Sequence, residues 1–253
     1  MFAEQRRLKI LELIQEEGSA RVKDLARIFG VTEPTVRQDL DKLDSEGLIL
    51  KEHGGAFLKS VPTQVKSFAL QHLENMEKKV AIAEKAASLV GDNEYLILDS
   101  GSTVSELAKF LAEKRNLTIV TNALNIALML GAVPGNEILV TGGEFKPPTL
   151  SLTGEKAAGF FQHLHASKLF LATGGISPNG DLTYPGLNDI PVKKAMIESA
   201  SEIYLLADST KFGKASLAIL GGIDLVDYIV TDADIDSKHI AYCEKRGIKV
   251  IIA

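Results

Sequence analysis

Five apolar runs in the second part of the chain are each followed directly by small polar residues that suit the binding of an anion. The first such segment, residues 99–103, reads DSGST and leads into a helical pattern. Its glycine lets the backbone approach a ligand, the hydroxyls after it can donate hydrogen bonds, and a helix N-terminus favours negative charge. The segment predicts a phosphate site, although an ordinary helix cap explains any one such turn at least as well.

The other four segments have the same character and are Thr121-Asn122, Thr141-Gly142-Gly143, Thr173-Gly174-Gly175 and Asp208-Ser209-Thr210-Lys211. In an open parallel sheet, ligands bind outside the carboxyl ends of the strands. Five polar strand ends on one rim therefore favour a polar ligand site. Lys193 and Lys211 are the cations best suited to serve an anionic ligand there, and a solvated surface position is the alternative for each.

A second kind of chemistry, the reading of bases in DNA, is indicated by residues 31–56, which read VTEPTVRQDLDKLDSEGLILKEHGGA. Thr32 is placed to cap a helix over 33–46, and Pro34 falls in its first turn, where the missing N–H costs nothing. Apolar side chains at i, i+4 and i+7 mark the inward face, and they are Val36, Leu40 and Leu43. The opposite face is left to contact DNA.

The outward face of this helix presents Arg37 and Gln38. An arginine binds a guanine edge bidentately or holds a phosphate, and a glutamine suits adenine. Other polar side chains would fix the position on the duplex through phosphate contacts. The full predicted set of DNA-binding residues is Thr32, Glu33, Thr35, Arg37, Gln38, Lys42, Lys51, His53, Arg6 and Arg7. A solvated helix face is the alternative for each charge.

Two further helices and a hairpin are predicted to position this reading helix. The first helix is indicated by Leu8, Leu11 and Ile14, flanked by Ile10 and Leu13, with Gly18 at its end. The second is marked by Val22, Leu25, Ala26 and Phe29, with Gly30 at its C-cap. Strands over 48–50 and 56–58 enclose His53-Gly54-Gly55. This is the layout of a winged helix-turn-helix, which places one helix in a DNA groove.

The rest of the chain follows a polar stretch around Pro62 that predicts a linker over 59–75. A helix is expected over 76–90, and apolar runs predict strands over 95–98, 117–120, 137–140, 168–172, 203–207, 228–230 and 248–252, with 217–220 as an additional one. Their alternation with helical segments indicates a mainly parallel sheet covered on both faces. The loop 177–189, with Tyr184 and Asn188, is expected either to close over a ligand or to be a static surface loop.

Composition excludes several other classes of protein. The chain has 253 residues, of which 45% are hydrophobic and 24% charged, as is ordinary for globular proteins. No apolar run approaches the about 20 residues that span a bilayer, and the N-terminus lacks a signal-peptide pattern, so a cytoplasmic protein is expected. The lone Cys243 excludes an intrachain disulfide and a cysteine-based zinc site. His163 and His165 have no third ligand, so neither a metal nor a cofactor is expected.

Along its whole length the chain resembles the DeoR family of bacterial transcriptional regulators. The resemblance rests on TEPTVRQDLDKLDSEGLILKEHGGA, and on LDSGST, VTN, TGGEF, VKKAMIESA and YLLADSTKFG further along. It implies an α/β fold, with an N-terminal winged helix-turn-helix followed by a Rossmann-like sensor domain similar to ribose-5-phosphate isomerase. The expected domains are 1–58 for DNA binding, 59–75 as a linker, and 76–253 for sugar-phosphate sensing and oligomerisation.

The resemblance also implies a repressor of a carbohydrate operon that a phosphorylated sugar releases from its operator. Carried over by motif, the effector site includes Asp99, Gly101, Ser102, Thr103, Thr121, Asn122, Gly174, Lys193 and Lys211. The chain departs from the family at Gln38, where a second basic residue is common. It departs again at 172–177, which read ATGGIS where the family often has Gly-Ala-Asp-Gly-Ile-Asp. Without those acids, the hydroxyl contacts expected there and the identity of the sugar stay open.

The rival hypothesis is a sugar-phosphate isomerase with an attached DNA-binding module. Isomerisation needs a carboxylate base near the substrate C–H, and residues 173–177 contain none, so binding without turnover is the simpler hypothesis. The net charge of −5 argues mildly against a nucleic-acid binder, although the local patch matters more than the total. DNA affinity must then come from a few cations, which predicts a homodimer or homotetramer that reads paired half-sites. The ligand is expected to shift the arrangement of that oligomer.

Overall fold

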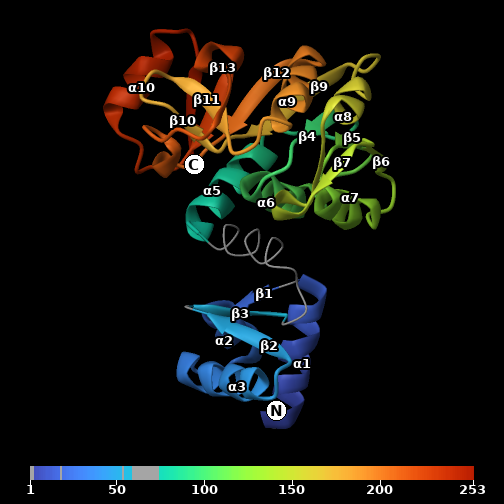
Figure 1. Ribbon diagram of the computed structural model, residues 1–253, viewed down its shortest axis with the longest axis vertical. Helices are drawn as coiled ribbons and strands as arrows, with labels where there is room; N and C mark the ends of the chain where they lie inside the picture. Colours follow the sequence, from blue (N-terminus) through green and yellow to red (C-terminus); the bar gives the residue numbers. More distant parts are fainter. Residues whose placement is uncertain (1–2, 18, 53, 59–73) are drawn as a thin grey trace. The chain divides into compact units, whose positions relative to one another are not determined.

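In the computed structural model, the chain forms two compact units, Met1–Glu74 and Asn75–Ala253 (Figure 1). The structure describes residues 3–17, 19–52, 54–58 and 74–253. Gly18, His53 and the first fifteen residues of the predicted linker, 59–73, lie outside the described residues. Within the described part of the chain, no helix is long and apolar enough to cross a membrane.

The described residues of the N-terminal unit form the helices α1 (Ala3–Glu17), α2 (Val22–Phe29) and α3 (Glu33–Ser45). Gly30 takes the left-handed conformation, with φ of 63°, that ends α2. Thr32 is the N-cap of α3, and its side chain accepts a hydrogen bond from the Thr35 backbone N–H at 3.4 Å. The predicted start and cap of the reading helix are therefore confirmed.

The inward faces of the three helices and of the sheet form the core of this unit. The buried residues of α3 include the three predicted apolar ones, Val36, Leu40 and Leu43. In α1, Ile10 and Ile14 are fully buried, whereas Leu8 is 60% exposed. The predicted helix is confirmed, although Leu8, one of the residues that indicated it, lies outside the buried stripe. The buried stripe runs at intervals of four through Arg6, Ile10 and Ile14, which places a charged residue at a core position.

A three-stranded antiparallel sheet completes the N-terminal unit. Its strands β1 (Ser19–Arg21), β2 (Ile49–Glu52) and β3 (Gly55–Leu58) lie in the order β1-β3-β2. The hairpin of β2 and β3 was predicted, but β1 is too short to show a periodicity. Gly55 is needed where β3 meets β1, because a Cβ there would lie 2.6 Å from the Ala20 carbonyl oxygen. The unit is a winged helix-turn-helix.

A seven-stranded sheet, parallel throughout, forms the centre of the described C-terminal unit, in the order β15-β14-β12-β9-β4-β5-β6. Its strands are β4 (Tyr95–Leu98), β5 (Thr118–Thr121), β6 (Glu137–Val140), β9 (Ala166–Ala172), β12 (Ala200–Leu206), β14 (Tyr228–Thr231) and β15 (Lys249–Ile252). Each overlaps one of the seven predicted runs. The chain proceeds outward from β4 to β6 and then resumes at β9 on the other side of β4. The topological switch point therefore lies between β4 and β9.

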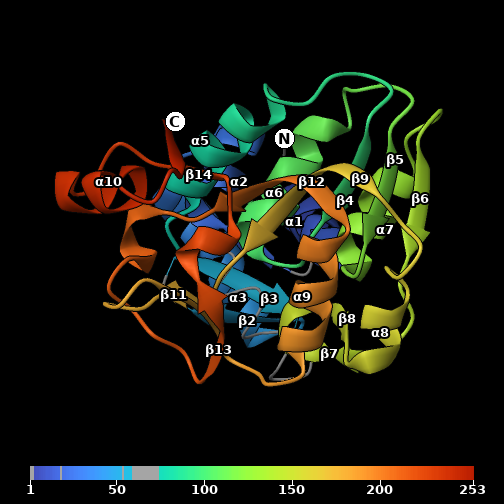
Figure 2. The same ribbon diagram turned by 90° about the horizontal axis from the view of Figure 1, so that it is seen from above.

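Helices cover both faces of this sheet. One face is packed by α5 (Met76–Ala87), α6 (Ser102–Leu111) and α7 (Leu124–Gly131), which form one layer in both views (Figures 1 and 2). The other face is packed by α8 (Glu155–Gly159), α9 (Asp189–Glu198) and α10 (Ser237–Glu244). Along β4, Leu96 and Leu98 face the first layer and Ile97 the second. The predicted α/β fold class is confirmed.

Two small antiparallel sheets flank the large one. One contains β10 (Gly175–Ile176), β11 (Asp181–Tyr184) and β13 (Ala218–Gly222), and the other pairs β7 (Glu144–Lys146) with β8 (Ser151–Thr153). The additional strand predicted at 217–220 is β13, although it is antiparallel. The expectation of an unstructured loop over 177–189 was wrong, because β11 occupies its middle and Tyr184 is buried there. Three 3₁₀ turns complete the unit, η1 (Pro147–Thr149), η2 (Ser209–Lys211) and η3 (Ile223–Leu225).

Candidate functional site

The exposed face of α3 carries the side chains predicted to read DNA. Arg37 and Gln38 are both exposed, and the Arg37 side chain retains 55% of its exposure. The Arg37 guanidinium donates to the Glu33 carboxylate at 2.9 Å, one helical turn away. An exposed pair of this kind is worth only about 0.3–0.5 kcal/mol, whereas a bidentate contact with a base is worth about 1–3 kcal/mol. A guanine edge or phosphate can therefore replace Glu33 at little cost.

Two other predicted cations at this surface are also paired with carboxylates of α3 or its end. Lys42 lies 3.3 Å from Glu46, and the Lys51 ammonium of the wing binds Asp41. Lys42, Glu46 and Asp41 are exposed, whereas Lys51 is partly buried. The phosphates of a duplex would therefore compete in water with these carboxylates for the two lysines. The surface is close to charge-balanced, as the sequence indicated.

Arg6 has a different place from the predicted one. Its side chain is only 10% exposed, and its Nε donates to Asp39 Oδ2 at 2.5 Å while its Nη2 donates to Oδ1 at 3.3 Å. Because Asp39 is itself buried, this bidentate pair ties α1 to the inner side of α3. Arg6 is therefore a structural residue rather than a phosphate contact. Arg7, more exposed, lies 3.8 Å from the same carboxylate.

In the C-terminal unit, the predicted effector residues gather at the carboxyl edge of the parallel sheet. Asp99 follows β4 directly at the switch point, and the backbone N–H of Ala172, at the end of β9, donates to its Oδ2 at 3.0 Å. The Ser100 backbone N–H donates to the other carboxylate oxygen at 2.6 Å. The carboxylate thus bridges the two strands between which a doubly wound sheet opens for ligands.

Lys193 of α9 completes this group. Its side chain is 3% exposed, its ammonium binds the Asp99 carboxylate, and it also donates to Ser100 Oγ at 3.3 Å. The Tyr184 ring lies 5.6 Å from the same ammonium, and the Tyr184 hydroxyl donates to the Ala172 carbonyl at 2.7 Å. The sequence placed Tyr184 either in a lid or in a static surface loop, but its buried phenol is part of the wall around Lys193.

Burial governs the protonation of this group. Complete removal from water raises the pKa of Asp99 above its usual 3.8, although the Lys193 charge and the two backbone N–H groups oppose the rise. The pKa of Tyr184 is raised well above its usual 10.0 by burial and by the charges of Asp99 and Asp189. The tyrosine therefore stays a neutral hydrogen-bond donor.

Gly101 connects Asp99 to α6 in a conformation that only glycine adopts easily. Its φ is 144°, and a Cβ on it would lie 2.7 Å from the Ala172 Cβ. No side chain caps α6, so Ser102 and Thr103 open the helix with backbone N–H groups that have no intrahelical acceptor. Thr103 is buried and Ser102 partly exposed, and both lie at the positive end of the helix.

The ends of β5 and β6 provide buried oxygen atoms without hydrogen-bond partners. Asn122 is fully buried, its Nδ2 donates to the Leu152 carbonyl at 3.0 Å, and its Oδ1 has no partner. The Thr141 hydroxyl, also buried, has none either. By contrast, the Thr121 hydroxyl donates to the Leu98 carbonyl and accepts from the Ala123 N–H, so it holds β5 to β4. Thr141 was among the polar strand ends noted in the sequence but was left out of the predicted effector set.

On the other side of the switch point, Asp208 follows β12. Its Oδ1 caps the turn η2, while its Oδ2 is buried and has no partner. Lys211, at the end of η2, is partly exposed and has no ion pair within the described part of the chain. Position 174 has room only for a glycine, because a Cβ there would lie 2.9 Å from both Ser216 Oγ and the Thr183 carbonyl oxygen. A buried carboxylate oxygen without a donor fits a ligand hydroxyl.

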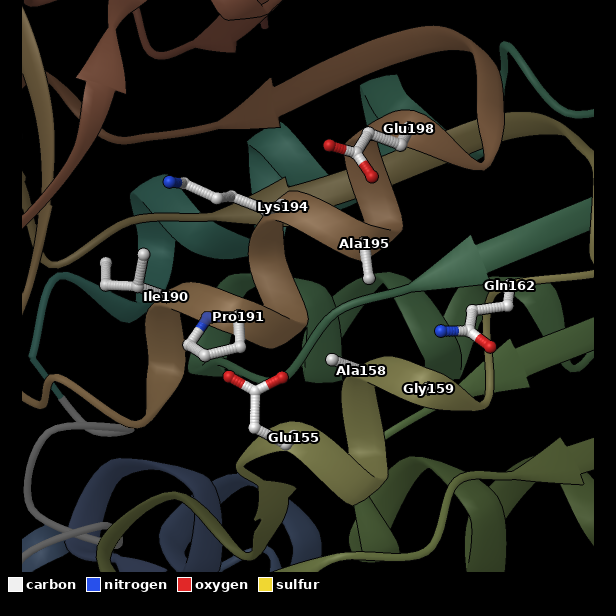
Figure 3. Close-up of a pocket in the computed structure, with 9 residues that line it drawn as sticks. All are labelled: Glu155, Ala158, Gly159, Gln162, Ile190, Pro191, Lys194, Ala195 and Glu198. Carbon is white, nitrogen blue, oxygen red and sulfur yellow. The ribbon is translucent and has the colours of Figure 1, made fainter.

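A separate hollow lies on the outer side of α9. It has a volume of about 410 Å³ between α8 and α9, where Glu155 and Glu198 come from the two helices (Figure 3). Its other lining residues are Ala158, Gly159, Gln162, Ile190, Pro191, Lys194 and Ala195. None of the unpartnered buried polar atoms of the described residues belongs to it. Asn122, Thr141 and Asp208, which do have such atoms, lie instead after β5, β6 and β12.

The two histidines noted in the sequence do not form a metal site. His165 Nε2 lies 2.9 Å from Ser201 Oγ, which is an ordinary surface hydrogen bond. Among the described residues, no group of three or more His, Cys, Asp or Glu side chains could hold a metal ion.

Family models match both units of the chain. Residues 6–61 match the DeoR-like helix-turn-helix domain, and residues 74–233 match the DeoR C terminal sensor domain. The chain is 32% identical to the HTH-type transcriptional regulator GolR of Listeria innocua over 253 residues, which covers 100% of both chains. It is also 32% identical over 229 residues, 90% of each chain, to the glycerol-3-phosphate regulon repressor of Escherichia coli. Ribose 5-phosphate isomerase A from Neisseria gonorrhoeae aligns at 15% identity with a TM-score of 0.40, over 53% of this chain and 52% of the isomerase.

A winged helix-turn-helix followed by a doubly wound α/β domain with a polar strand-end site defines a DNA-binding transcriptional regulator with a sensor domain. The chain belongs to the DeoR family of transcriptional regulators.

Proposed function

We propose that the protein is a cytoplasmic repressor of a carbohydrate operon that leaves its operator when a phosphorylated sugar binds at the carboxyl edge of its sheet. In this proposal, residues 1–58 bind double-stranded DNA, 59–75 link the domains, and 76–253 sense the effector and hold the oligomer together. The relatives are named as regulators, one of them of a glycerol-3-phosphate regulon, which favours a phosphorylated polyol as the ligand class.

The main support for an effector site is a set of buried oxygen atoms that have no hydrogen-bond partner along the carboxyl edge of the sheet. Asn122 Oδ1, Thr141 Oγ1 and Asp208 Oδ2 follow β5, β6 and β12, and they flank the Asp99–Lys193 pair at the switch point. Two of these three atoms can only accept hydrogen bonds, so a ligand with several hydroxyl donors suits them. The N-terminus of α6 and Lys211 suit its phosphate.

The DNA part rests on the exposed face of α3. Arg37 and Gln38 would contact base edges, while Lys42, Lys51, Thr35 and Arg7 would contact the backbone. Because each cation there is neutralised by a carboxylate, one copy binds weakly, and a homodimer or homotetramer reading paired half-sites is needed for specific binding.

Binding without turnover is favoured by the segment after β9. Residues 173–177 run into β10 without a carboxylate, and the nearby Asp99 is fully buried and paired with Lys193. A general base needs a carboxylate free to accept a proton from the substrate, so Asp208, whose Oδ2 has no partner, is the remaining candidate that a turnover assay must test. Incubation of the protein with ribose 5-phosphate, followed by proton NMR, should give no ribulose 5-phosphate; steady turnover would show an enzyme instead.

A thermal-shift screen tests the proposal for the ligand. The probes are glycerol 3-phosphate, ribose 5-phosphate and glucose 6-phosphate, with their unphosphorylated parents and inorganic phosphate as controls. A ligand at about 100 times its dissociation constant adds about 2.7 kcal/mol of stability, so one phosphorylated probe should raise the melting temperature by several degrees. Equal shifts with the unphosphorylated parents, or shifts with none of the probes, would contradict the proposed site.

A further inference from the structure

The turn after β12 touches the proposed effector site on one side and the start of the sensor domain on the other. On the site side is Asp208, whose Oδ1 accepts hydrogen bonds from the Thr210 backbone N–H at 2.9 Å and from the Thr210 hydroxyl at 2.5 Å. Its Oδ2 is buried and has no partner. Asp208 thus holds the turn η2 through Oδ1 and can accept a hydrogen bond from a ligand through Oδ2.

On the other side of the turn, the side chains of η2 hold the first residues of α5. Asn75 Nδ2 donates to Thr210 Oγ1 at 3.3 Å, and Lys78 Nζ donates to Ser209 Oγ at 2.7 Å. Asn75 is the N-cap of α5, yet it has a left-handed φ of 51° and its side chain makes no capping bond to its own helix. The start of α5 is therefore fixed by the turn rather than by a local cap.

Lys78 is the centre of this contact. Besides Ser209, its ammonium binds Asp232 Oδ1 and Asp234 Oδ2, each at 2.8 Å, from the loop after β14. Asp232 accepts in turn from the Ser209 backbone N–H at 2.6 Å and from its hydroxyl at 2.9 Å. The Lys78 side chain is 24% exposed and that of Asp232 is 8% exposed, whereas that of Asp234 is 76% exposed, so water screens the Lys78–Asp232 pair less than the Lys78–Asp234 pair.

The protonation of these groups agrees with a formed ion pair. Burial acts to raise the pKa of Asp232, but the hydrogen bonds from Lys78 and Ser209 outweigh it and lower the pKa below its usual 3.8. The pKa of Lys78 is raised from its usual 10.5, because its bonds to Asp232 and Asp234 outweigh its loss of water. Both side chains are charged over the whole physiological range.

We propose that Lys78 is a positioning residue that transmits the state of the Asp208–Lys211 turn to the start of α5, and so to the chain that leads to the DNA-binding unit. This inference rests on the proposed function and names the regulation of its site. A ligand hydroxyl on Asp208 Oδ2 and a ligand phosphate on Lys211 add contacts at the two ends of η2, and these contacts shift the turn that the Oδ1 bonds hold in place. The displaced Ser209 and Thr210 then release Lys78 and Asn75, and α5 begins differently in the two states, as coupling between sites requires.

The test compares Lys78→Met with two matched variants. Lys78→Arg keeps the charge and the donors, and Lys85→Met removes the same charge from the exposed last turn of the same helix. For each full-length protein, calorimetry measures binding of the sugar phosphate that the thermal-shift screen identifies among the three probes. Fluorescence anisotropy measures the dissociation constant for an operator obtained by selection from random duplexes, with and without saturating sugar phosphate, at fixed salt.

We expect saturating sugar phosphate to weaken operator binding about tenfold or more in the wild type, in Lys78→Arg and in Lys85→Met, but less than about twofold in Lys78→Met. Sugar-phosphate affinity and ligand-free operator affinity should stay within about twofold of the wild type, which a merely structural role would not predict. If sugar phosphate weakened operator binding by Lys78→Met as much as by the wild type, this inference would be overturned and the proposed function would stand. A wild type whose operator affinity no sugar phosphate changes would overturn the proposed function, and this inference with it.

Discussion

Replacing Lys193 by Met removes the ammonium from the switch point while keeping the length and most of the volume of the side chain. In the wild type this ammonium binds Asp99, which has no exposed surface. The substitution leaves the Asp99 carboxylate with two backbone N–H donors, from Ser100 at 2.6 Å and Ala172 at 3.0 Å. A buried charge that loses its partner costs about 3–5 kcal/mol, and the two remaining donors favour the lower end, about 3 kcal/mol.

The double variant Asp99→Asn/Lys193→Met separates the lost charge pair from lost packing. It removes both charges, so no unpaired ion remains inside the sheet edge. One cost is left, because the amide nitrogen of Asn faces one of the two backbone N–H groups that the carboxylate accepted. That lost hydrogen bond amounts to about 1–2 kcal/mol. The double variant should therefore be more stable than Lys193→Met, although it carries one more substitution.

The pH dependence of Lys193→Met has a definite sign. Burial raises the pKa of folded Asp99 above 3.8, and the Lys193 charge opposes that rise, so removing Lys193 raises this pKa further. At pH values between 3.8 and the raised pKa, Asp99 of the folded protein binds a proton, whereas Asp99 of the unfolded chain does not. The stability lost by Lys193→Met should thus be largest at about pH 8 and become smaller towards about pH 5.

Urea unfolding followed by tyrosine fluorescence measures these values for the sensor domain alone. The chain has no tryptophan, and its five tyrosines all lie in the C-terminal unit. A Lys193→Met variant within about 1 kcal/mol of the wild type at neutral pH, or a double variant less stable than Lys193→Met, would show that Lys193 does not stabilise a buried Asp99 charge.

Three further predictions concern single side chains. Arg37→Ala should abolish specific operator binding with the fold intact, since about 1–3 kcal/mol is lost at each half-site; unchanged affinity in an anisotropy titration at fixed salt would remove Arg37 from the interface. Arg6→Ala should destabilise the N-terminal unit by about 3 kcal/mol because Asp39 stays buried, which faster hydrogen exchange of α1 amides would report. Gly101→Ala should lower the stability of the sensor domain by about 1–3 kcal/mol in urea, because of its φ and the Ala172 contact, and wild-type stability would refute this.

The sequence predicts elements whose signal is local. The reading helix α3 combined a capping Thr32, an early Pro34 and three apolar residues at helical spacing, and all of these lie as expected. The strands of the parallel sheet are buried on both faces, so each stands out as a short continuous apolar run. Polar residues directly after such runs were found for the same reason.

Features that depend on distant partners were missed. Arg6 occupies a core position because it is paired there with Asp39, which is 33 residues away in the sequence. A pattern of apolar residues cannot identify an arginine as inward-facing. Tyr184 lies in a stretch with the Gly and Pro of a loop, yet pairing with β13 makes it a strand. The three-residue strands β1, β7 and β8 are shorter than any repeating pattern can reveal.

The central claim is that ligand binding at the sheet edge controls DNA binding by α3. Its most direct measurement is the operator dissociation constant of the full-length wild type, at fixed salt, with and without a sugar phosphate that calorimetry shows to be bound. We expect the bound sugar phosphate to raise this constant about tenfold or more, which lies within the range of typical coupling. An unchanged dissociation constant with the ligand bound would contradict it.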